Sequence, residues 1–486
     1  IDREGKPLTR GATTEHTLLN AGFNLLGTSL AAQEYWDNHR ALDYLLTRKD
    51  IDPERIGVYG SSGGGTQTAY YIGLDPRVKV AAICSFFSTR ERTMELQGPS
   101  DGCQHIPYEG REQLEVPDFA LMMAPRPLLI LSGKYDFVDL WGAQQGFAEL
   151  QQCYKVLGVP EKVDMLTVET GHGLGAEKRQ KLVSWFKRWL KDDQSPVKKS
   201  AQDRFRLSDM LCTTKGQVNV SMPGALSIMQ ENVNQLDEWA SKREAFLSKG
   251  KKTVQTKMLD LLGLKGLPDH KIRIEATGHD SMREYEQYKF QLIREGEMPV
   301  PCILIMPSRA NADSPIELRL QEEGKGTYLS EYANFAAALT EGKILLLADL
   351  RGLGETTDPA FYTDAKYWNR EYRNAMISMH IGRPIMGQRV VDILTLLDFC
   401  SEHELLKGHP VKVFANGIYG PAVIHAAYLD ERINSVEIKH SVKTWKEYIE
   451  KPMQWDMYSN VLYGALKYYD LPDLIRLSNR PIRFAD

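Results

Sequence analysis

The sequence predicts an α/β protein with two domains, each built on a mostly parallel sheet with flanking helices. Short apolar runs alternate with helical patterns from residue 56 to residue 190, which is typical of a parallel sheet. A polar stretch at 192–203 interrupts this pattern, and a second series of apolar runs follows it. The chain has 486 residues, which is too long for one ordinary hydrophobic core.

The elements of the first domain follow from the spacing of its apolar residues. Residues 14–48 have a helical pattern that places Leu30, Tyr35, Leu42, Leu45 and Leu46 near one face. Further helices are predicted after the predicted strands, including 141–158 and 177–190. Strands are predicted at 56–59, 78–87, from 125 onward, and at 163–169.

The central motif is Gly60-Ser61-Ser62-Gly63-Gly64, which stands between the apolar run 56–59 and a helical pattern. A Gly-x-Ser-x-Gly sequence in a strand–turn–helix context is typical of a nucleophilic serine on a tight, strained turn. Such a turn lifts the Ser62 hydroxyl above the strand end and aims the Gly63 N–H at a developing oxyanion. Alone, the same five residues are also compatible with a turn that has no chemistry.

Two residues at later strand ends complete a candidate catalytic set. Asp136 follows the third predicted strand, and His172 follows the fourth. The imidazole of His172 can take the serine proton, while Asp136 can hold the imidazole and stabilise its cation. Asp139 is an alternative to Asp136 as the acid. Because strand ends in such sheets gather the chemistry, the order Ser62, Asp136, His172 favours the catalytic interpretation.

The polar stretch 88–117 is expected to border this site. Its Arg90, Arg92 and His105 are candidate substrate-binding residues for carboxylates or hydroxyls. Salt bridging on a solvated face explains the same residues equally well.

The second half predicts a linker and helical segment, 193–258, between a catalytic domain at 1–192 and a second domain at 259–486. Residues 411–433 repeat the pattern of 56–78: strand, turn, helix, Leu-Asp-x-Arg. Gly417 stands at the position of Ser62, and glycine has no nucleophile. We therefore expect a degenerate, catalytically silent domain that packs against or shapes the first. Its strands are predicted as a hairpin, 272–278 with 283–295, followed by 300–308, 342–352, 411–417 and 435–441.

Composition excludes several classes of protein. Lys and Arg number 60 against 64 Asp and Glu, so the sequence has no nucleic-acid signature. Apolar runs stay below membrane-spanning length. The six cysteines are scattered without metal-ligand spacing, so we expect reduced thiols and no metal or organic cofactor in the chemistry.

The sequence also predicts that both sheets need further strands. Residues 1–55 read as helical, although an early strand and its loop normally complete an oxyanion hole of this kind. The second domain is expected to stop before counterparts of the third and fourth strands. We expect an additional segment or chain, upstream of Ile1 and after Asp486, to complete the two sheets.

These motifs resemble a known group. TEHTLLNAG, YWDNHRALDYL, DPERIGVYGSSGGGTQT, LDPRVK, APRPLLIL and LLLADLRGLGET are similar to bacterial tandem α/β-hydrolase carbohydrate esterases, both acetylxylan-esterase-like and pectin-methylesterase-like. The resemblance implies Ser62 as nucleophile, His172 as base and Asp136 as acid, in a periplasmic or secreted protein that acts on plant polysaccharide. The sequence departs from the group at Cys103, where an acidic residue is expected, which affects the substrate more than the triad.

The leading expectation is thus a serine carbohydrate esterase, with a slight preference for methyl esters of pectic uronates because of Arg90, Arg92 and His105. An acetyl (xylan) esterase is the first alternative. A serine peptidase of the prolyl-oligopeptidase kind shares the triad order, but the chain has no propeller-like repeat. A carbohydrate-binding or scaffold protein is the non-enzymatic alternative.

Overall fold

The computed structural model describes residues 9, 11–198, 205–214, 216–359 and 369–485. It divides into two compact units: the first extends up to Asn20 and from Ser29 to Ser227, and the second contains Ala21–Thr28 and continues from Ile228. This division differs from the predicted boundaries at 192 and 258. Helices α9 (Ile228–Leu247) and α10 (Lys251–Leu261) belong to the second unit, where Leu236, Leu247 and Met258 are buried.

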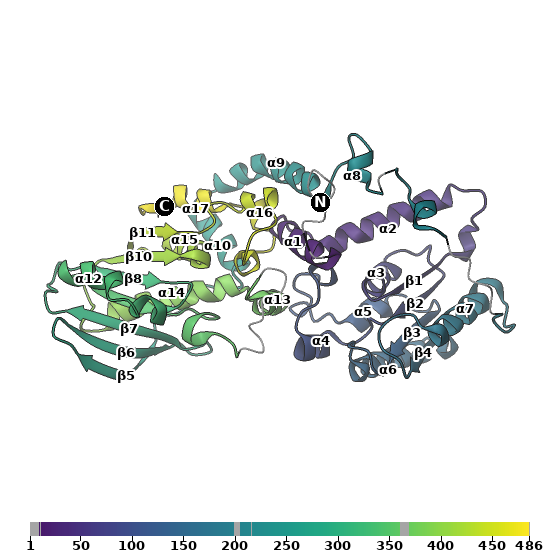
Figure 1. Cartoon of the computed structure of the whole chain (residues 1–486), viewed down its shortest axis with the longest axis horizontal. Helices are drawn as coiled ribbons and strands as arrows, with labels where there is room; N and C mark the ends of the chain where they lie inside the picture. Colours follow the sequence, from purple (N-terminus) through teal and green to yellow (C-terminus); the bar gives the residue numbers. More distant parts are fainter. Residues whose placement is uncertain (1–8, 10, 199–204, 215, 360–368, 486) are drawn as a thin grey trace. The chain divides into compact units, whose positions relative to one another are not determined.

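The first unit is built on a four-stranded sheet whose strands are all parallel and follow one another in sequence order (Figure 1). All four strands predicted for this domain are present. Among the described residues β1 pairs on one side only, with β2. The strands are β1 (Gly57–Ser61), β2 (Val80–Cys84), β3 (Leu128–Gly133) and β4 (Val163–Val168).

Helices cover both faces of this sheet, so the two central strands are buried at every position. Successive side chains point to opposite faces, so Ile83 and Ile130 pack with α3 and α6, while Ala82 and Leu129 pack with α7. The helices are α1 (Ala12–Leu25), which is divided between the units, α2 (Leu30–Leu46), α3 (Gly63–Ile72), α4 (Arg90–Gln97), α5 (Val116–Leu121), α6 (Leu140–Val156), α7 (Ala176–Lys191) and α8 (Val218–Ser221), with 3-10 turns η1 (Pro53–Arg55), η2 (Gly102–Gln104), η3 (Pro160–Lys162) and η4 (Leu207–Met210).

The second unit holds an eight-stranded mixed sheet in the order β12-β11-β10-β8-β9-β7-β6-β5. Strands β8 to β12 run parallel, while β5, β6 and β7 form an antiparallel meander that joins them at β9. The predicted hairpin is therefore confirmed. The strands are β5 (Arg273–Ser281), β6 (Tyr285–Ile293), β7 (Val300–Pro307), β8 (Ile316–Leu320), β9 (Ile344–Ala348), β10 (Val411–Asn416), β11 (Ile433–Lys439) and β12 (Ile482–Ala485).

Helices also cover the mixed sheet, and α15 is buried at every one of its residues. The remaining helices of this unit are α11 (Lys325–Leu329), α12 (Ala333–Thr340), α13 (Tyr372–His380), α14 (Ile385–Glu402), α15 (Gly420–Leu429), α16 (Lys446–Glu450) and α17 (Leu471–Leu477). The 3-10 turns are η5 (Gly354–Thr356), η7 (Gly417–Tyr419), η8 (Met457–Asn460) and η9 (Ala465–Lys467).

One expectation about the second domain is wrong. Of the two strands that the sequence analysis places after Asp486, the counterpart of β3 is present in the chain as β12. β12 pairs in parallel with β11, as β3 pairs with β2. The succession β10, α15, β11, β12 therefore repeats the succession β1, α3, β2, β3.

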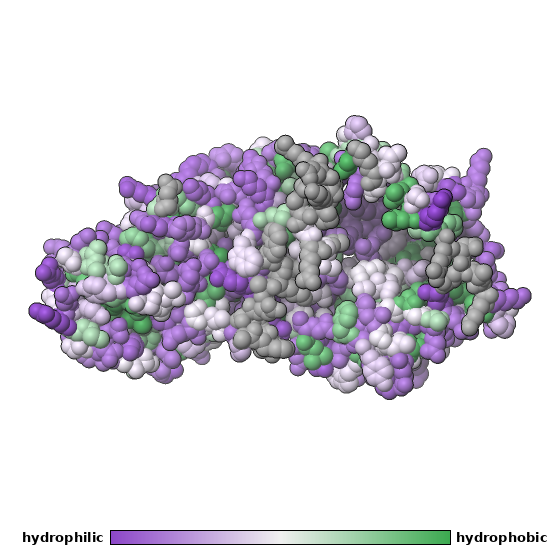
Figure 2. Space-filling model, in the orientation of Figure 1, coloured by the Kyte–Doolittle hydropathy of each residue, from purple (hydrophilic) through white to green (hydrophobic). Residues whose placement is uncertain are grey.

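On the face drawn in Figure 2, apolar residues occur in small groups between hydrophilic ones. None of the described helices combines the length and the apolar character that crossing a bilayer requires.

Candidate functional site

The candidate site begins at the turn between β1 and α3. Ser62 lies there with φ 59° and ψ −123°, outside the conformations that residues with a side chain normally adopt. Gly63 is the first residue of α3, so its N–H has no partner within the helix. A strained serine followed by a free helix N-terminus is the geometry of a nucleophile beside an oxyanion donor.

Glycine is required at two positions around this turn, 60 and 65. A Cβ at Gly60 would lie 1.9 Å from the carbonyl oxygen of Gly64, and a Cβ at Gly65 would lie 2.8 Å from the carbonyl oxygen of Cys84. By contrast, a Cβ at Gly63 or Gly64 would meet nothing within 4 Å. Close packing of helix on strand therefore explains Gly60 and Gly65, whereas the space around the turn does not require glycine at 63 or 64.

His172 and Asp136 lie together at the carboxyl ends of neighbouring strands. Nδ1 of His172 is 2.8 Å from Oδ1 of Asp136, to which the Val138 amide also donates, at 3.1 Å. The Asp136 side chain is 1% exposed and that of His172 is 29% exposed. One side of the imidazole is therefore exposed to solvent, while Nδ1 bonds a buried carboxylate. This bond places the proton on Nδ1 and leaves Nε2 available as a base.

The carboxylate of Asp136 is held in its charged form. Burial alone would raise its pKa, but hydrogen bonds from His172, the Val138 amide and the Ser85 hydroxyl outweigh that effect and lower it. Asp136 is thus an anion at neutral pH and can stabilise an imidazolium at His172.

Three further residues support the histidine and were not found from the sequence. The ring of Phe137 stacks on that of His172, with centroids 4.2 Å apart. Ser85, which follows β2 with φ 50°, accepts hydrogen bonds from the Gly173 amide at 3.0 Å and from Nζ of Lys178 at 3.2 Å. Lys178 is fully buried and also bonds to the carbonyl of Gly173, so this lysine and Ser85 anchor the loop that carries His172.

Asp139, the alternative acid, has a different role. It is the N-cap of α6, where its carboxylate accepts from the Gly142 amide at 2.6 Å. It also lies 3.4 Å from Nε of Arg92. The structure therefore pairs His172 with Asp136 and uses Asp139 as a helix cap.

Two of the three predicted substrate-binding residues are not on the surface, which corrects their assignment. Arg90 is 1% exposed, and its guanidinium bonds Glu109 at 2.9 Å, the Tyr70 hydroxyl at 2.8 Å and the Gln104 carbonyl at 2.9 Å. His105 is 3% exposed. Because both side chains are buried in the packing of the segment after β2, they cannot hold the carboxylates of a polymer.

Arg92 is the remaining candidate. Its side chain is 26% exposed, pairs with Glu95 and Asp139, and lies over the ring of Trp141. Its charge is thus already matched by two carboxylates.

The corresponding turn of the second unit is built differently. Gly417 has φ 68°, close to the value at Ser62, but a Cβ there would lie 1.6 Å from the Glu322 carboxylate. That carboxylate accepts from the Ile418 amide at 3.0 Å, the counterpart of the Gly63 amide, and is paired with Arg370 at 2.6 Å. A fixed anion thus occupies the place of nucleophile and oxyanion, beside a cavity of about 430 Å³ that His440 and Trp455 help to line.

Comparison with known proteins supports a hydrolase fold for the first unit. Residues 25–193, less than half of the chain, match the prolyl oligopeptidase family. The YtaP protein of Bacillus subtilis (strain 168), described as a hydrolase, is 27% identical over 168 residues, which are 34% of this chain and 56% of that protein. The chain therefore matches little more than half the length of this curated relative.

Among solved structures, the similarity is distant. A Bacteroides fragilis NCTC 9343 protein described as an acetyl xylan esterase, BF1801, has a TM-score of 0.43 at 14% identity, over 54% of this chain and 75% of that chain. The methylesterase BT1017 has a TM-score of 0.33 at 24% identity, over 50% of this chain and 51% of that chain. The parallel sheet, its elbow and its flanking helices give the first unit an α/β-hydrolase-like fold, and a second domain with a mixed sheet accompanies it.

Proposed function

We propose that the protein is a serine carboxylic-ester hydrolase that removes ester groups from plant cell-wall carbohydrate. The observation that carries this proposal is the strained Ser62 at the start of α3, at the same sheet edge as the bonded pair His172 and Asp136. These three residue types supply a nucleophile, a base and an orienting anion, which are the parts that acyl transfer requires.

In this mechanism the Ser62 hydroxyl attacks the ester carbonyl while His172 takes its proton. The Gly63 N–H donates to the oxyanion of the tetrahedral intermediate. His172 then protonates the leaving alcohol, and an acyl-enzyme remains on Ser62. Water, deprotonated by His172, releases the acid, and Asp136 stabilises the imidazolium in both halves of the reaction.

The carbohydrate part of the proposal is supported by the resemblance of the motifs to tandem carbohydrate esterases. The preference for methyl esters depended on three basic residues, of which Arg90 and His105 are buried. Methyl and acetyl esters are therefore proposed with equal weight. In a methyl-esterified uronate the sugar chain becomes the acyl group, whereas in an acetylated sugar the acetate does.

Product analysis tests the ester class. The full chain is incubated with methyl-esterified pectin and with acetylated xylan, and methanol and acetate are measured over time. Release of either, abolished by Ser62→Ala and retained by the helix-cap variant Asp139→Asn of unchanged fold, supports the proposal. Release of neither product from these polymers, or release that persists in Ser62→Ala, contradicts it.

A serine peptidase is the second candidate, because residues 25–193 match the prolyl oligopeptidase family. The two activities differ in the leaving group. It is an amine when a peptide is cleaved and an alcohol when an ester is cleaved. A proline-containing peptide amide and an ester of the same acyl group separate them. Amide cleavage within tenfold of ester cleavage would favour the peptidase.

A periplasmic or secreted location is part of the proposal, since a polysaccharide must be met outside the cytoplasm. Immunodetection of the full-length natural protein in fractionated cells checks this. Detection in the cytoplasmic fraction alone would contradict the location and would leave the ester chemistry to be judged by product analysis.

A further inference from the structure

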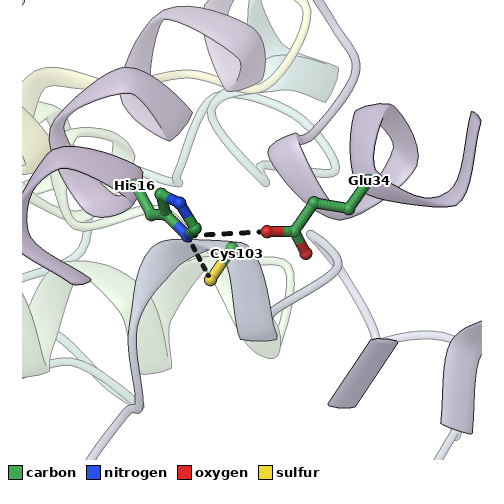
Figure 3. A group of neighbouring side chains, drawn as sticks. All are labelled: His16, Glu34 and Cys103. Atoms are coloured by element: carbon green, nitrogen blue, oxygen red, sulfur yellow. Dashed lines mark hydrogen bonds and ion pairs between the residues drawn. The ribbon is translucent and has the colours of Figure 1, made fainter. Parts of the chain in front are cut away.

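Three potential metal ligands meet in the first unit, on residues outside the candidate catalytic set. His16 lies on α1, Glu34 on α2 and Cys103 on the turn η2, and Figure 3 shows the three side chains pointing toward one another. Nδ1 of His16 is 3.3 Å from Sγ of Cys103 and 3.5 Å from Oε1 of Glu34. All three ligand atoms lie within 4.8 Å of one another.

These distances fit a tetrahedral ion. Zn²⁺ binds imidazole, carboxylate and thiolate at about 2.0–2.3 Å, so two ligands at the tetrahedral angle lie roughly 3.3–3.8 Å apart. The Nδ1–Sγ separation of 3.3 Å and the Nδ1–Oε1 separation of 3.5 Å are close to the edges of such a tetrahedron. The third edge, between Sγ and the carboxylate oxygen, is no longer than 4.8 Å.

Hydrogen bonding alone accounts for this arrangement poorly. One nitrogen of His16 faces both the sulfur and the carboxylate oxygen. A neutral imidazole nitrogen has either one hydrogen or one lone pair, directed along one line in the ring plane. A cation between the three atoms would use all of them at once.

The surroundings suit a site with one open position. Cys103 is 7% exposed and the Glu34 side chain 16%, whereas the His16 side chain is 38% exposed. Two ligands are therefore held in the packing, and the third borders solvent, from which a water molecule can complete the coordination.

We propose that His16, Glu34 and Cys103 bind one zinc ion that stabilises the segment after β2. On binding, bonds form from Zn²⁺ to Nδ1, to a carboxylate oxygen and to Sγ, and the Cys103 thiol gives its proton to the solvent. No step of ester hydrolysis passes through this ion, so the site can fail or succeed independently of the proposed function.

The turn η2 is the part that such an ion would fix. Its Gly102 amide bonds the Thr17 hydroxyl on α1 at 2.9 Å, and its Gln104 carbonyl accepts from the Tyr70 hydroxyl on α3 at 2.9 Å. Zinc would therefore tie α1 and α2 to a turn that already contacts the helix beginning at Gly63. The scattered positions 16, 34 and 103 explain why no local spacing in the sequence reveals the site.

The test uses the full-length protein stripped with a chelator and titrated with Zn²⁺ against a chromophoric competitor. We expect one equivalent to bind and to raise the Tm, with binding weakened at least about tenfold in Cys103→Ser and in Glu34→Gln. Cys153→Ser, a half-buried cysteine on α6, is the matched control and should bind as the wild type does.

Cobalt gives a readout that a merely structural role of Cys103 would not move. Co²⁺ in the site should show a thiolate-to-metal charge-transfer absorption that is lost in Cys103→Ser and kept in Cys153→Ser. Circular dichroism and ester turnover confirm that each variant is folded. Absence of zinc binding by the wild type, or equal affinity in a folded Cys103→Ser, would overturn the proposal.

Discussion

At the level of single residues, Asp136 and Asp139 were both candidates for the carboxylate partner of His172. The structure places Asp136 in hydrogen-bonding contact with His172. Ser62→Ala and His172→Ala should each lower kcat by about 10³-fold or more, as in comparable triads. Asp136→Asn should also cripple turnover, because the amide favours the wrong imidazole tautomer. Steady-state kinetics with a small ester measures this, and Asp139→Asn with an equally large loss would contradict the assignment.

Substitution of Arg90 tests whether this buried cation stabilises the fold or binds the substrate. Arg90→Met leaves the buried carboxylate of Glu109 without its guanidinium, which should lower the free energy of unfolding by about 3–5 kcal/mol. Arg92→Met, at a partly exposed ion pair, should change it by less than about 1 kcal/mol. Urea denaturation gives both values. An unchanged stability with a raised KM in Arg90→Met would return Arg90 to the substrate site.

At the level of elements, the Leu-Asp-x-Arg sequence ends the equivalent helices α3 and α15 in the same way. Asp75 accepts from the Arg77 amide at 3.1 Å, and Asp430 accepts from the Arg432 amide at 2.9 Å. Each arginine side chain also pairs with its aspartate. A short motif thus builds the same turn in both units.

Acid sensitivity follows from the first of these turns. Burial would raise the pKa of Asp75, but hydrogen bonds from Arg77 and from the Tyr71 hydroxyl hold it well below its ordinary value. The resulting stability is present above about pH 4, the unfolded pKa, and is lost as the pH falls toward the native pKa. Asp75→Asn should therefore be less stable than wild type at pH 7, with the difference shrinking below about pH 4.

Urea denaturation at a series of pH values measures this difference. Asp50→Asn, at an exposed pair with Arg48, is the control and should change stability little. A difference for Asp75→Asn that stays constant from pH 7 to pH 2.5 would contradict the expected linkage.

The two strands that the sequence analysis missed, β8 and β12, both carry charged residues. β8 reads Ile-Glu-Leu-Arg-Leu, and β12 reads Ile-Arg-Phe-Ala. Glu317 is 2% exposed within β8 because Arg319 and Lys343 pair with it. The partner Lys343 lies outside β8, so the local pattern of this strand does not contain it.

The same limit applies to the site. Order and strand-end position were enough to predict that Asp136 and His172 lie together, at the same sheet edge as Ser62, because topology brings strand ends together. The burial of Arg90 and the supporting role of Lys178 depend on partners far along the chain, Glu109 and Ser85 respectively. Local spacing carries no information about such partners.

For the whole molecule, the turn at Gly417, which corresponds to the turn at Ser62, allows a prediction of where a serine-directed reagent reacts. A fluorophosphonate probe should label Ser62 alone, located by peptide mass spectrometry. In the double variant Ser62→Ala/Gly417→Ser no label should appear, because the Glu322 carboxylate occupies the position of the new side chain. Labelling anywhere within 411–486 would show that the second domain retains a reactive nucleophile.

The division of α1 between the two units bears on how the chain is made. Residues 21–28 belong to the second unit, where the Asn24 carbonyl accepts from the Gly464 amide at 2.7 Å and the Gly27 carbonyl accepts from Tyr463 and Lys467. A ribosome that delivers residue 28 must wait for more than four hundred further residues before these bonds can form, as their partners are at 463–467. The second unit can therefore be completed only after residues 463–467 have been made, because it incorporates residues 21–28.

A fragment that begins at Ile228 should accordingly lack the piece that binds Gly464. We expect it to unfold at lower temperature than the same unit in the full chain, and to regain stability when a peptide of residues 21–28 is added in excess. Calorimetry with and without the peptide measures the effect. An equally stable fragment would mean that the second unit does not need residues 21–28 for its stability.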